Sequence, residues 1–174
     1  MSFMNKYEAY SESIRLIHKY FPESKSTFTK ELGIGIYNFI TSMKFCDFNL
    51  DLSCTHGGSV QEFELSEKGG FIGDNDKVYQ RLLLHSGFKP EGRCVIIPDV
   101  VSENDWESYS VIPIICDSDM VGRRLLELET DSNYEIFDGS SFDTLFVFES
   151  GEAMGVDHDN RFFWAKSKKR KVIG

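Results

Sequence analysis

The stretch that decides the fold runs from Phe142 to Lys166 and reads FDTLFVFESGEAMGVDHDNRFFWAK. Leu145 to Phe148 form an unbroken run of apolar residues, which is typical of a strand covered on both faces. Turn residues follow at Ser150-Gly151 and at Asp159-Asn160, because glycine tolerates positive φ and Asp and Asn side chains bond the nearby backbone. The pattern predicts a C-terminal meander of three short antiparallel strands.

The N-terminal part of the chain predicts helices. Apolar residues recur at three- and four-residue steps over residues 5–20 and again from Thr27 to Met43, which is the period of an amphipathic helix. Pro22 ends the first helix because a proline pushes the preceding residue out of the helical region. Gly33 and Gly35 weaken the second helix, so a strand over residues 34–40 is the competing interpretation. The inward residues expected in the first helix are Tyr7, Tyr10, Ile14, Ile17 and Phe21.

Strands are predicted from Phe48 onward. Apolar and polar residues alternate from Phe48 to Ser53, as on a half-buried strand, and a partner strand is expected over residues 60–65. The short apolar run at residues 94–97 predicts a buried strand. A further strand is expected over residues 111–116, where Pro113 favours an edge of the sheet or a bulge.

Two more helices are predicted between these strands. Asn75 or Asp76 is expected to cap a helix over residues 77–86, and Gly87 is expected to close it in the left-handed conformation. Asp117 or Ser118 is expected to cap another helix that continues through residue 129. These elements alternate with strands along the chain, so the helices and strands belong to one mixed fold.

Length and pattern predict one α+β domain. A chain of 174 residues is long enough to bury a core, and it contains no internal repeat or linker-like tract. We therefore expect a single domain over residues 1–165 and a basic C-terminal tail over residues 166–174. Within the domain we expect a largely antiparallel sheet, with helices packed mainly on one side.

The composition favours a cytoplasmic protein. No apolar segment approaches the roughly 20 residues that a membrane-spanning helix needs, and the N-terminus has no apolar signal core. The four cysteines form no Cys-x-x-Cys pair, so we expect them to be reduced and buried. These cysteines are Cys46, Cys54, Cys94 and Cys116.

The formal net charge of −9 is unevenly distributed. Five of the 19 basic residues lie in the tail, which leaves 14 basic against 28 acidic side chains in residues 1–165, a net charge of −14. Such a field repels nucleic acid and attracts a basic protein, although acidic surfaces also serve simply to keep a protein in solution. The basic tail is the one segment suited to phosphate, and it lacks aromatic residues to stack on bases.

Catalytic and metal-binding motifs are mostly absent. Residues 74–76 begin like a calcium loop, but Tyr79 stands where the loop needs glycine and His85 where it needs glutamate. Cys54 and His56 are close in sequence, yet no second pair follows at zinc-finger spacing. We therefore predict no metal, no cofactor and no catalytic residue.

Asp157-His158-Asp159 is the triplet that best supports an enzyme. Carboxylate and imidazole groups together can bind a metal or transfer protons. On a continuous strand, however, the two aspartates would point to one face and His158 to the other, so only a tight turn would unite them. The alternative hypothesis is a small hydrolase or metal-binding enzyme that uses Asp157, His158 and His56.

Acidic side chains and one tryptophan form the candidate partner-binding surface. Trp106 lies among charged residues in the acidic segment 99–110, where an exposed aromatic ring would suit an interface and a ring folded over the sheet is the other interpretation. The candidate surface also includes carboxylates near the start of the helix expected over residues 77–86 and at the turn of the meander. The full set is Asp74, Asp76, Asp99, Glu103, Asp105, Trp106, Glu107, Asp157 and Asp159.

The chain resembles bacterial toxin-immunity proteins of the contact-dependent inhibition or polymorphic toxin type. The resemblance lies in the size, the acidity, the α+β pattern and the closing segment from Leu145 to Trp164, LFVFESGEAMGVDHDNRFFW. It implies a non-enzymatic cytoplasmic antitoxin, whose partner is often a basic nuclease toxin covered at its active site or on an adjacent surface.

Overall fold

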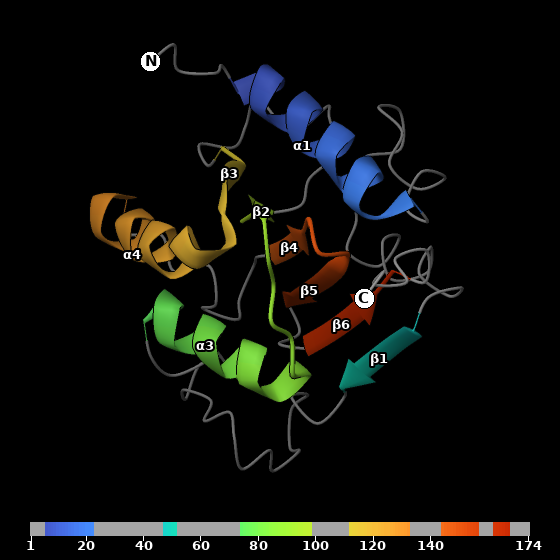
Figure 1. Cartoon of the computed structure of the whole chain (residues 1–174). Helices are drawn as coiled ribbons and strands as arrows, with labels where there is room; N and C mark the ends of the chain where they lie inside the picture. The colour runs from blue at the N-terminus through green and yellow to red at the C-terminus, as the bar shows by residue number, and fades with distance from the viewer. Residues whose placement is uncertain are drawn as a thin grey trace.

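The computed structural model describes residues 6–22, 47–51, 74–98, 112–132, 144–156 and 162–167. Within these ranges, helices and a six-stranded antiparallel sheet form an α+β fold, which confirms the predicted class (Figure 1). The helices are α1 (Lys6–Tyr20), α3 (Asn75–Ser86) and α4 (Val121–Ser132), the last preceded by the 3-10 turn η5 (Ser118–Met120). The strands are β1 (Asp47–Asp51), β2 (Arg93–Ile97), β3 (Ile114–Asp117), β4 (Thr144–Phe148), β5 (Glu152–Val156) and β6 (Phe162–Lys166).

The sheet has the strand order β1-β6-β5-β4-β2-β3. Strands β4, β5 and β6 are neighbours in this order, which confirms the predicted meander, and every residue of β4 is buried. The turn between β4 and β5 uses Gly151 at φ 84°, whose N–H donates to the carbonyl of Phe148 at 2.9 Å. The predicted turn at residues 159–160 lies outside the described residues.

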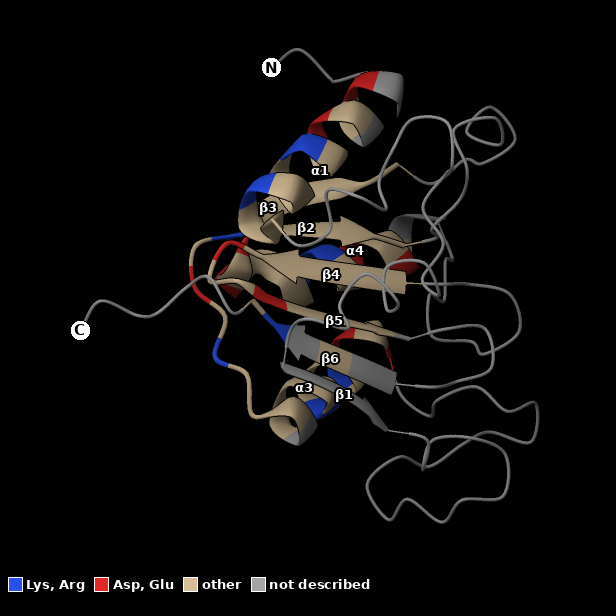
Figure 2. Cartoon of the chain, turned by 90° about the vertical axis from the view of Figure 1, so that its right-hand side faces the viewer, with Lys and Arg blue, Asp and Glu red and all other residues tan. Residues whose placement is uncertain are grey.

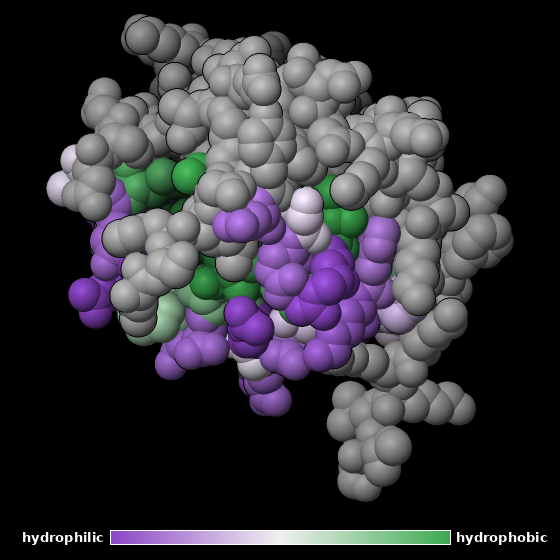
Figure 3. Space-filling view, turned by 90° about the horizontal axis from the view of Figure 1, so that it is seen from above, coloured by the Kyte–Doolittle hydropathy of each residue, from purple (hydrophilic) through white to green (hydrophobic). Residues whose placement is uncertain are grey.

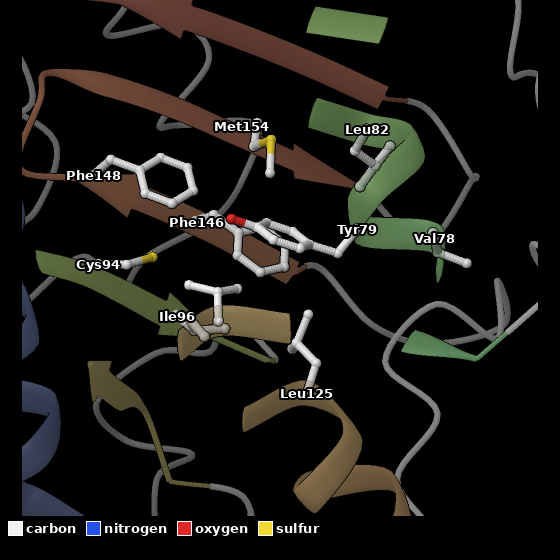
Figure 4. Packing of buried hydrophobic residues seen from close by; sticks show 10 residues of the cluster. Val78, Tyr79, Leu82, Cys94, Ile96, Leu125, Phe146, Phe148 and Met154 are labelled. Atoms are coloured by element: carbon white, nitrogen blue, oxygen red, sulfur yellow. The ribbon is translucent and has the colours of Figure 1, made fainter. Parts of the chain in front are cut away.

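Helices α3 and α4 pack on one face of the sheet. Their buried side chains meet the side chains that alternate residues of β2, β4 and β5 present to that face (Figure 4). The rings of Tyr79 and Phe146 lie at the centre of this contact, with centroids 5.4 Å apart. The cluster consists of Val78, Tyr79, Leu82, Cys94, Ile96, Val121, Leu125, Phe146, Phe148 and Met154.

Helix α1 covers the opposite face, where it contacts β2 and β4 (Figure 2). Of the three helices that the structure describes, two therefore share a face, in agreement with the prediction of helices mainly on one side. Coverage of both faces explains why β4 is buried throughout. The buried stripe of α1 differs partly from the predicted one, since Ile14 is only half-buried and the buried apolar residues are Ala9, Leu16, Ile17, Tyr20 and Phe21.

The helix starts differ in detail from the predictions. Asp74 is the N-cap of α3, not Asn75 or Asp76, because its side chain accepts a hydrogen bond from the backbone N–H of Lys77 at 2.8 Å. The closing residue was predicted correctly: Gly87 has φ 70° and its N–H donates to the Leu83 carbonyl. Helix α4 does not begin directly after its predicted cap, because the intervening turn η5 is 3-10.

Several predictions concern residues outside the described ranges. These are the helix over 27–43 with its alternative strand, the strand over 60–65, and residues 168–174 of the tail predicted over 166–174. The first residue of that predicted tail, Lys166, is the last residue of β6. Strand β3 does lie at an edge of the sheet, as Pro113 indicated. None of the helices in the described part of the chain is long and apolar enough to cross a membrane.

Candidate functional site

A cleft of about 440 Å³ opens between α3 and the beginning of α4. Three separate segments of the chain form it: helix α3, Pro90 in the segment that leads into β2, and the turn η5 with the first residues of α4. The lining is mixed, with apolar, polar and charged side chains. It consists of Asp76, Tyr79, Gln80, Leu83, Pro90, Ser118, Asp119, Gly122 and Arg123.

Helices α3 and α4 are held together at the N-terminus of α3. The N–H of Asn75 donates to the Glu129 carboxylate at 2.9 Å, and the Asn75 side-chain amide donates to the Leu125 carbonyl at 3.4 Å. A carboxylate at this position also interacts favourably with the positive end of the dipole of α3. These bonds fix the spacing of the two helices that border the cleft.

Gly122 lets the two helices approach closely. A Cβ atom added at Gly122 would collide with the carboxylate of Asp76. Asp76 in turn accepts a hydrogen bond from the side-chain amide of Gln80 at 3.2 Å, which holds its carboxylate toward the start of α4. The absent side chain at Gly122 therefore makes room for an acidic group in the cleft.

The other side of the cleft is fixed to the sheet. The Ser118 hydroxyl donates to the Pro90 carbonyl at 3.2 Å, and the Ser118 N–H donates to the Gly92 carbonyl at 2.8 Å. Turn η5 is thereby tied to the chain that enters β2. Asp119 follows Ser118 directly, so its exposed carboxylate is positioned on a turn that the backbone holds in place.

The cleft carries a net negative charge in the described part of the chain. The Arg123 guanidinium lies 3.0 Å from Glu127, a carboxylate that Arg124 also contacts at 2.7 Å. The hydrogen bond from Arg124, and the one from Arg123, lower the pKa of Glu127, so this carboxylate is ionised and is shared by the two guanidinium groups. Neither Asp76 nor Asp119 forms an ion pair with another described residue.

Tyr79 lines the cleft, but its hydroxyl points into the core (Figure 4). The side chain is 1% exposed, and its hydroxyl finds no hydrogen-bond partner among the described residues. Figure 4 shows the ring directed from α3 into the core, beside Phe146. Burial raises the pKa of this phenol, so it stays protonated.

The outer surface of α1 carries acidic and basic side chains together. Hydrophilic side chains gather over this helix (Figure 3), and its exposed residues include Glu8, Arg15 and Lys19. The Arg15 guanidinium contacts Glu12 at 2.6 Å, and the hydrogen bond from Arg15 lowers the pKa of Glu12. The described surface of α1 therefore carries charges of both signs.

Two of the predicted partner-binding residues, Asp74 and Asp76, lie in the described part of the chain, and the structure gives them different roles. Asp74 is engaged within the chain, because it caps α3 and lies 3.2 Å from the Lys77 ammonium group. The backbone hydrogen bond from Lys77 is the main cause that lowers the pKa of Asp74. Asp76, by contrast, lines the cleft.

The remaining predicted residues lie outside the described ranges. They are Asp99, Glu103, Asp105, Trp106, Glu107, Asp157 and Asp159, together with His56 and His158 of the enzyme hypothesis. Sequence reasoning missed Asp119, because nothing in the sequence pairs η5 with α3. It also treated Tyr79 only as an obstacle to a calcium loop.

The chemistry of the cleft suits a cationic side chain. Carboxylates accept charge-assisted hydrogen bonds from guanidinium and ammonium groups, and Leu83 and Pro90 offer apolar surface to the alkyl part of such a side chain. Among the described residues, no group of three or more His, Cys, Asp or Glu side chains could hold a metal ion.

Comparison with models of protein families, with curated proteins and with solved structures gives no match for this chain.

Proposed function

We propose that this chain is a non-enzymatic, cytoplasmic binding protein that neutralises a cognate toxin with a basic surface, such as a nuclease domain. It would do so by covering the active site of the toxin or an adjacent surface. The observation that carries the proposal is the cleft, in which Asp76 and Asp119 flank apolar surface without a cation of their own in the described part of the chain.

The contrast with other carboxylates supports this assignment. Glu12, Asp74 and Glu152 each have a cation of the same chain within 3.4 Å. Such pairs are already satisfied and gain little from a partner. Asp76 and Asp119 are described carboxylates of one cleft that a partner's Arg or Lys could engage.

The overall charge supports a basic partner as well. A net charge of −9 creates a field that accelerates the encounter with a cationic surface. Nucleases need cationic clefts to bind phosphate, and an anionic protein can occupy those clefts.

The cleft alone is smaller than a whole interface. Stable protein complexes bury about 1,200–2,000 Å², with a few residues supplying most of the binding energy. We therefore assign the cleft one anchoring side chain of the toxin. Trp106 and the neighbouring acids Asp99, Glu103, Asp105 and Glu107, with Asp157 and Asp159, are proposed to complete the surface.

Co-expression tests the proposal. The protein encoded by the neighbouring reading frame is produced in bacteria alone and together with this chain, and growth is followed. We expect that protein to arrest growth alone, and this chain to restore growth and to bind it in titration calorimetry. A neighbouring protein that is harmless, or one that stays toxic and unbound, would contradict the proposal.

A further inference from the structure

Two cysteines lie directly opposite each other on neighbouring strands. Cys94 of β2 and Cys116 of β3 are partners in the antiparallel register, and both are free thiols. Directly opposite residues of an antiparallel pair project from the same face of the sheet. Both side chains pack against the core cluster beneath α3 and α4, as that rule requires.

The backbone hydrogen bonds define the type of this pair. The carbonyl of Arg93 accepts from the Glu149 N–H at 2.8 Å and so points toward β4, which turns the backbone groups of Cys94 toward β3. On the other side, the Ser118 N–H donates to the Gly92 carbonyl at 2.8 Å. Because bonded positions alternate, Cys94 and Cys116 form a hydrogen-bonded pair, whose Cα atoms lie about 5.5 Å apart.

The Cα spacing of this pair permits a disulfide. Bridged cysteines usually have Cα atoms about 4.4–6.8 Å apart, with the commonest values near 5.5–6 Å. The Cβ atoms of a hydrogen-bonded pair lie toward the far end of the range of about 4.5–5.5 Å for opposite residues. A relaxed disulfide has its Cβ atoms about 3.5–4.5 Å apart, so the two strands must draw together by about 1 Å. A bond formed under such strain is easier to reduce.

The two thiols differ in access to solvent. Cys94 is fully buried, whereas Cys116, on the edge strand, is only partly buried. An oxidant therefore reaches Cys116 first, and Cys94 is placed to react with the product.

We propose that Cys94 and Cys116 are a reversible modification site that hydrogen peroxide converts into a disulfide joining β2 to β3. The small fraction of Cys116 that is thiolate at pH 8 attacks one peroxide oxygen, the O–O bond breaks, and hydroxide leaves with the formation of a sulfenic acid. The Cys94 sulfur then attacks the Cys116 sulfur, an S–S bond forms, and the hydroxyl group leaves as water. Two thiols and one peroxide thus give one disulfide and two waters.

The disulfide would act on the edge of the sheet and on the cleft beside it. Strand β3 continues into η5, which supplies Ser118 and Asp119 to the cleft. Joining β3 covalently to β2 would fix that side of the cleft and restrict the unfolded chain. The inference itself depends on the strand register, and it stands whether or not the partner is a toxin.

Peptide mapping tests the inference on the full chain. A variant with Cys46→Ser and Cys54→Ser is treated with hydrogen peroxide at pH 8, and its thiols, intact mass and cross-linked peptides are measured. We expect both thiols to disappear, the mass to fall by two hydrogen atoms, and one linked peptide pair to contain Cys94 and Cys116. The melting temperature should rise by several degrees, and dithiothreitol should abolish the rise.

Two controls make a negative result informative. The same oxidation of the wild-type chain shows whether Cys94 and Cys116 still pair when Cys46 and Cys54 are present. Adding Cys116→Ser should leave the Cys94 thiol intact. Oxidation of Cys116 to sulfinic acid without a cross-link, linkage to Cys46 or Cys54 in the wild-type chain, or two unreacted thiols would each overturn the inference.

Discussion

At the scale of single residues, the start of α3 shows how position decides the role of a carboxylate. Asp74 and Asp76 are two residues apart, and both were predicted to face a partner. Asp74 instead satisfies the N–H of Lys77 at 2.8 Å, while Asp76 lies over Gly122 in the cleft. A stability test should therefore separate the two residues.

Asp74→Ala should lower the free energy of unfolding by about 1 kcal/mol, because the helix loses its N-cap. Chemical denaturation of the full chain measures this change. Asp76→Asn serves as the comparison, since it keeps an oxygen that can accept from Gln80 and should change stability by less than about 0.5 kcal/mol. Equal losses in the two variants would contradict the assignment of the cap.

Tyr79→Phe should stabilise the protein or leave it unchanged. The hydroxyl of Tyr79 is buried and has no partner among the described residues, so its removal should recover part of a desolvation cost of about 1–3 kcal/mol. Thermal unfolding checks the prediction. A marked loss of stability would show that the hydroxyl makes a bond essential to the fold.

At the scale of elements, the pair of helices α3 and α4 forms the cleft. Alanine normally stabilises a helix by about 0.8–1 kcal/mol relative to glycine. At Gly122 the added methyl group would collide with Asp76, so this gain should be offset or reversed.

A double-mutant cycle measures this coupling. Gly122→Ala should give no increase in stability in the wild-type chain, and a clear increase once Asp76→Ala has removed the carboxylate. The interaction energy expected for residues in contact is about 0.5–3 kcal/mol. Additive effects of the two substitutions would mean that the helices do not approach as closely as described.

The elements themselves could largely be predicted from the sequence, because their periods are local. The apolar run of β4, Gly87 at the end of α3 and the edge position signalled by Pro113 all depend on nearby residues. The N-cap of α3 was misplaced because Asp74 and its two neighbours Asn75 and Asp76 are all good capping residues. Only the backbone conformation distinguishes them.

The cleft could not be predicted because its contacts join residues distant in sequence. Gly122 looks like an ordinary weak point in a helix until α3 is placed beside it. Asp119 and Asp76 share no pattern in the sequence. The pairing of Cys94 with Cys116 across β2 and β3 likewise depends on the register of the two strands, which the sequence pattern alone did not define.

At the scale of the whole molecule, buried cysteine thiols and a buried tyrosine hydroxyl should make the stability of the fold sensitive to alkaline pH. Burial raises the pKa of Cys116 to about 11, and it also raises the pKa values of Cys94 and Tyr79. Unfolded cysteine and tyrosine lose their protons near pH 8.5 and pH 10. Above those values the folded chain binds more protons than the unfolded chain, so the free energy of unfolding falls as the pH rises.

Thermal unfolding between pH 7 and roughly pH 10.5 checks this dependence, since the window brackets the ordinary thiol and phenol pKa values. The melting temperature should be steady at first and should fall as the pH passes through the ordinary cysteine value. Cys94→Ala should reduce the slope. A melting temperature that stays level or rises across this window would contradict the burial of these groups.

The central claim is that unpaired carboxylates in the cleft meet a cationic partner, and association kinetics test it most directly. The association rate of the basic partner is measured by stopped flow for wild type, for Asp76→Asn with Asp119→Asn, and for Glu8→Gln with Glu12→Gln. Both double variants change the net charge equally. The cleft variant should associate several-fold more slowly and show a weaker salt dependence, while the α1 variant should stay close to wild type. Equal rates for the two variants would contradict the claim.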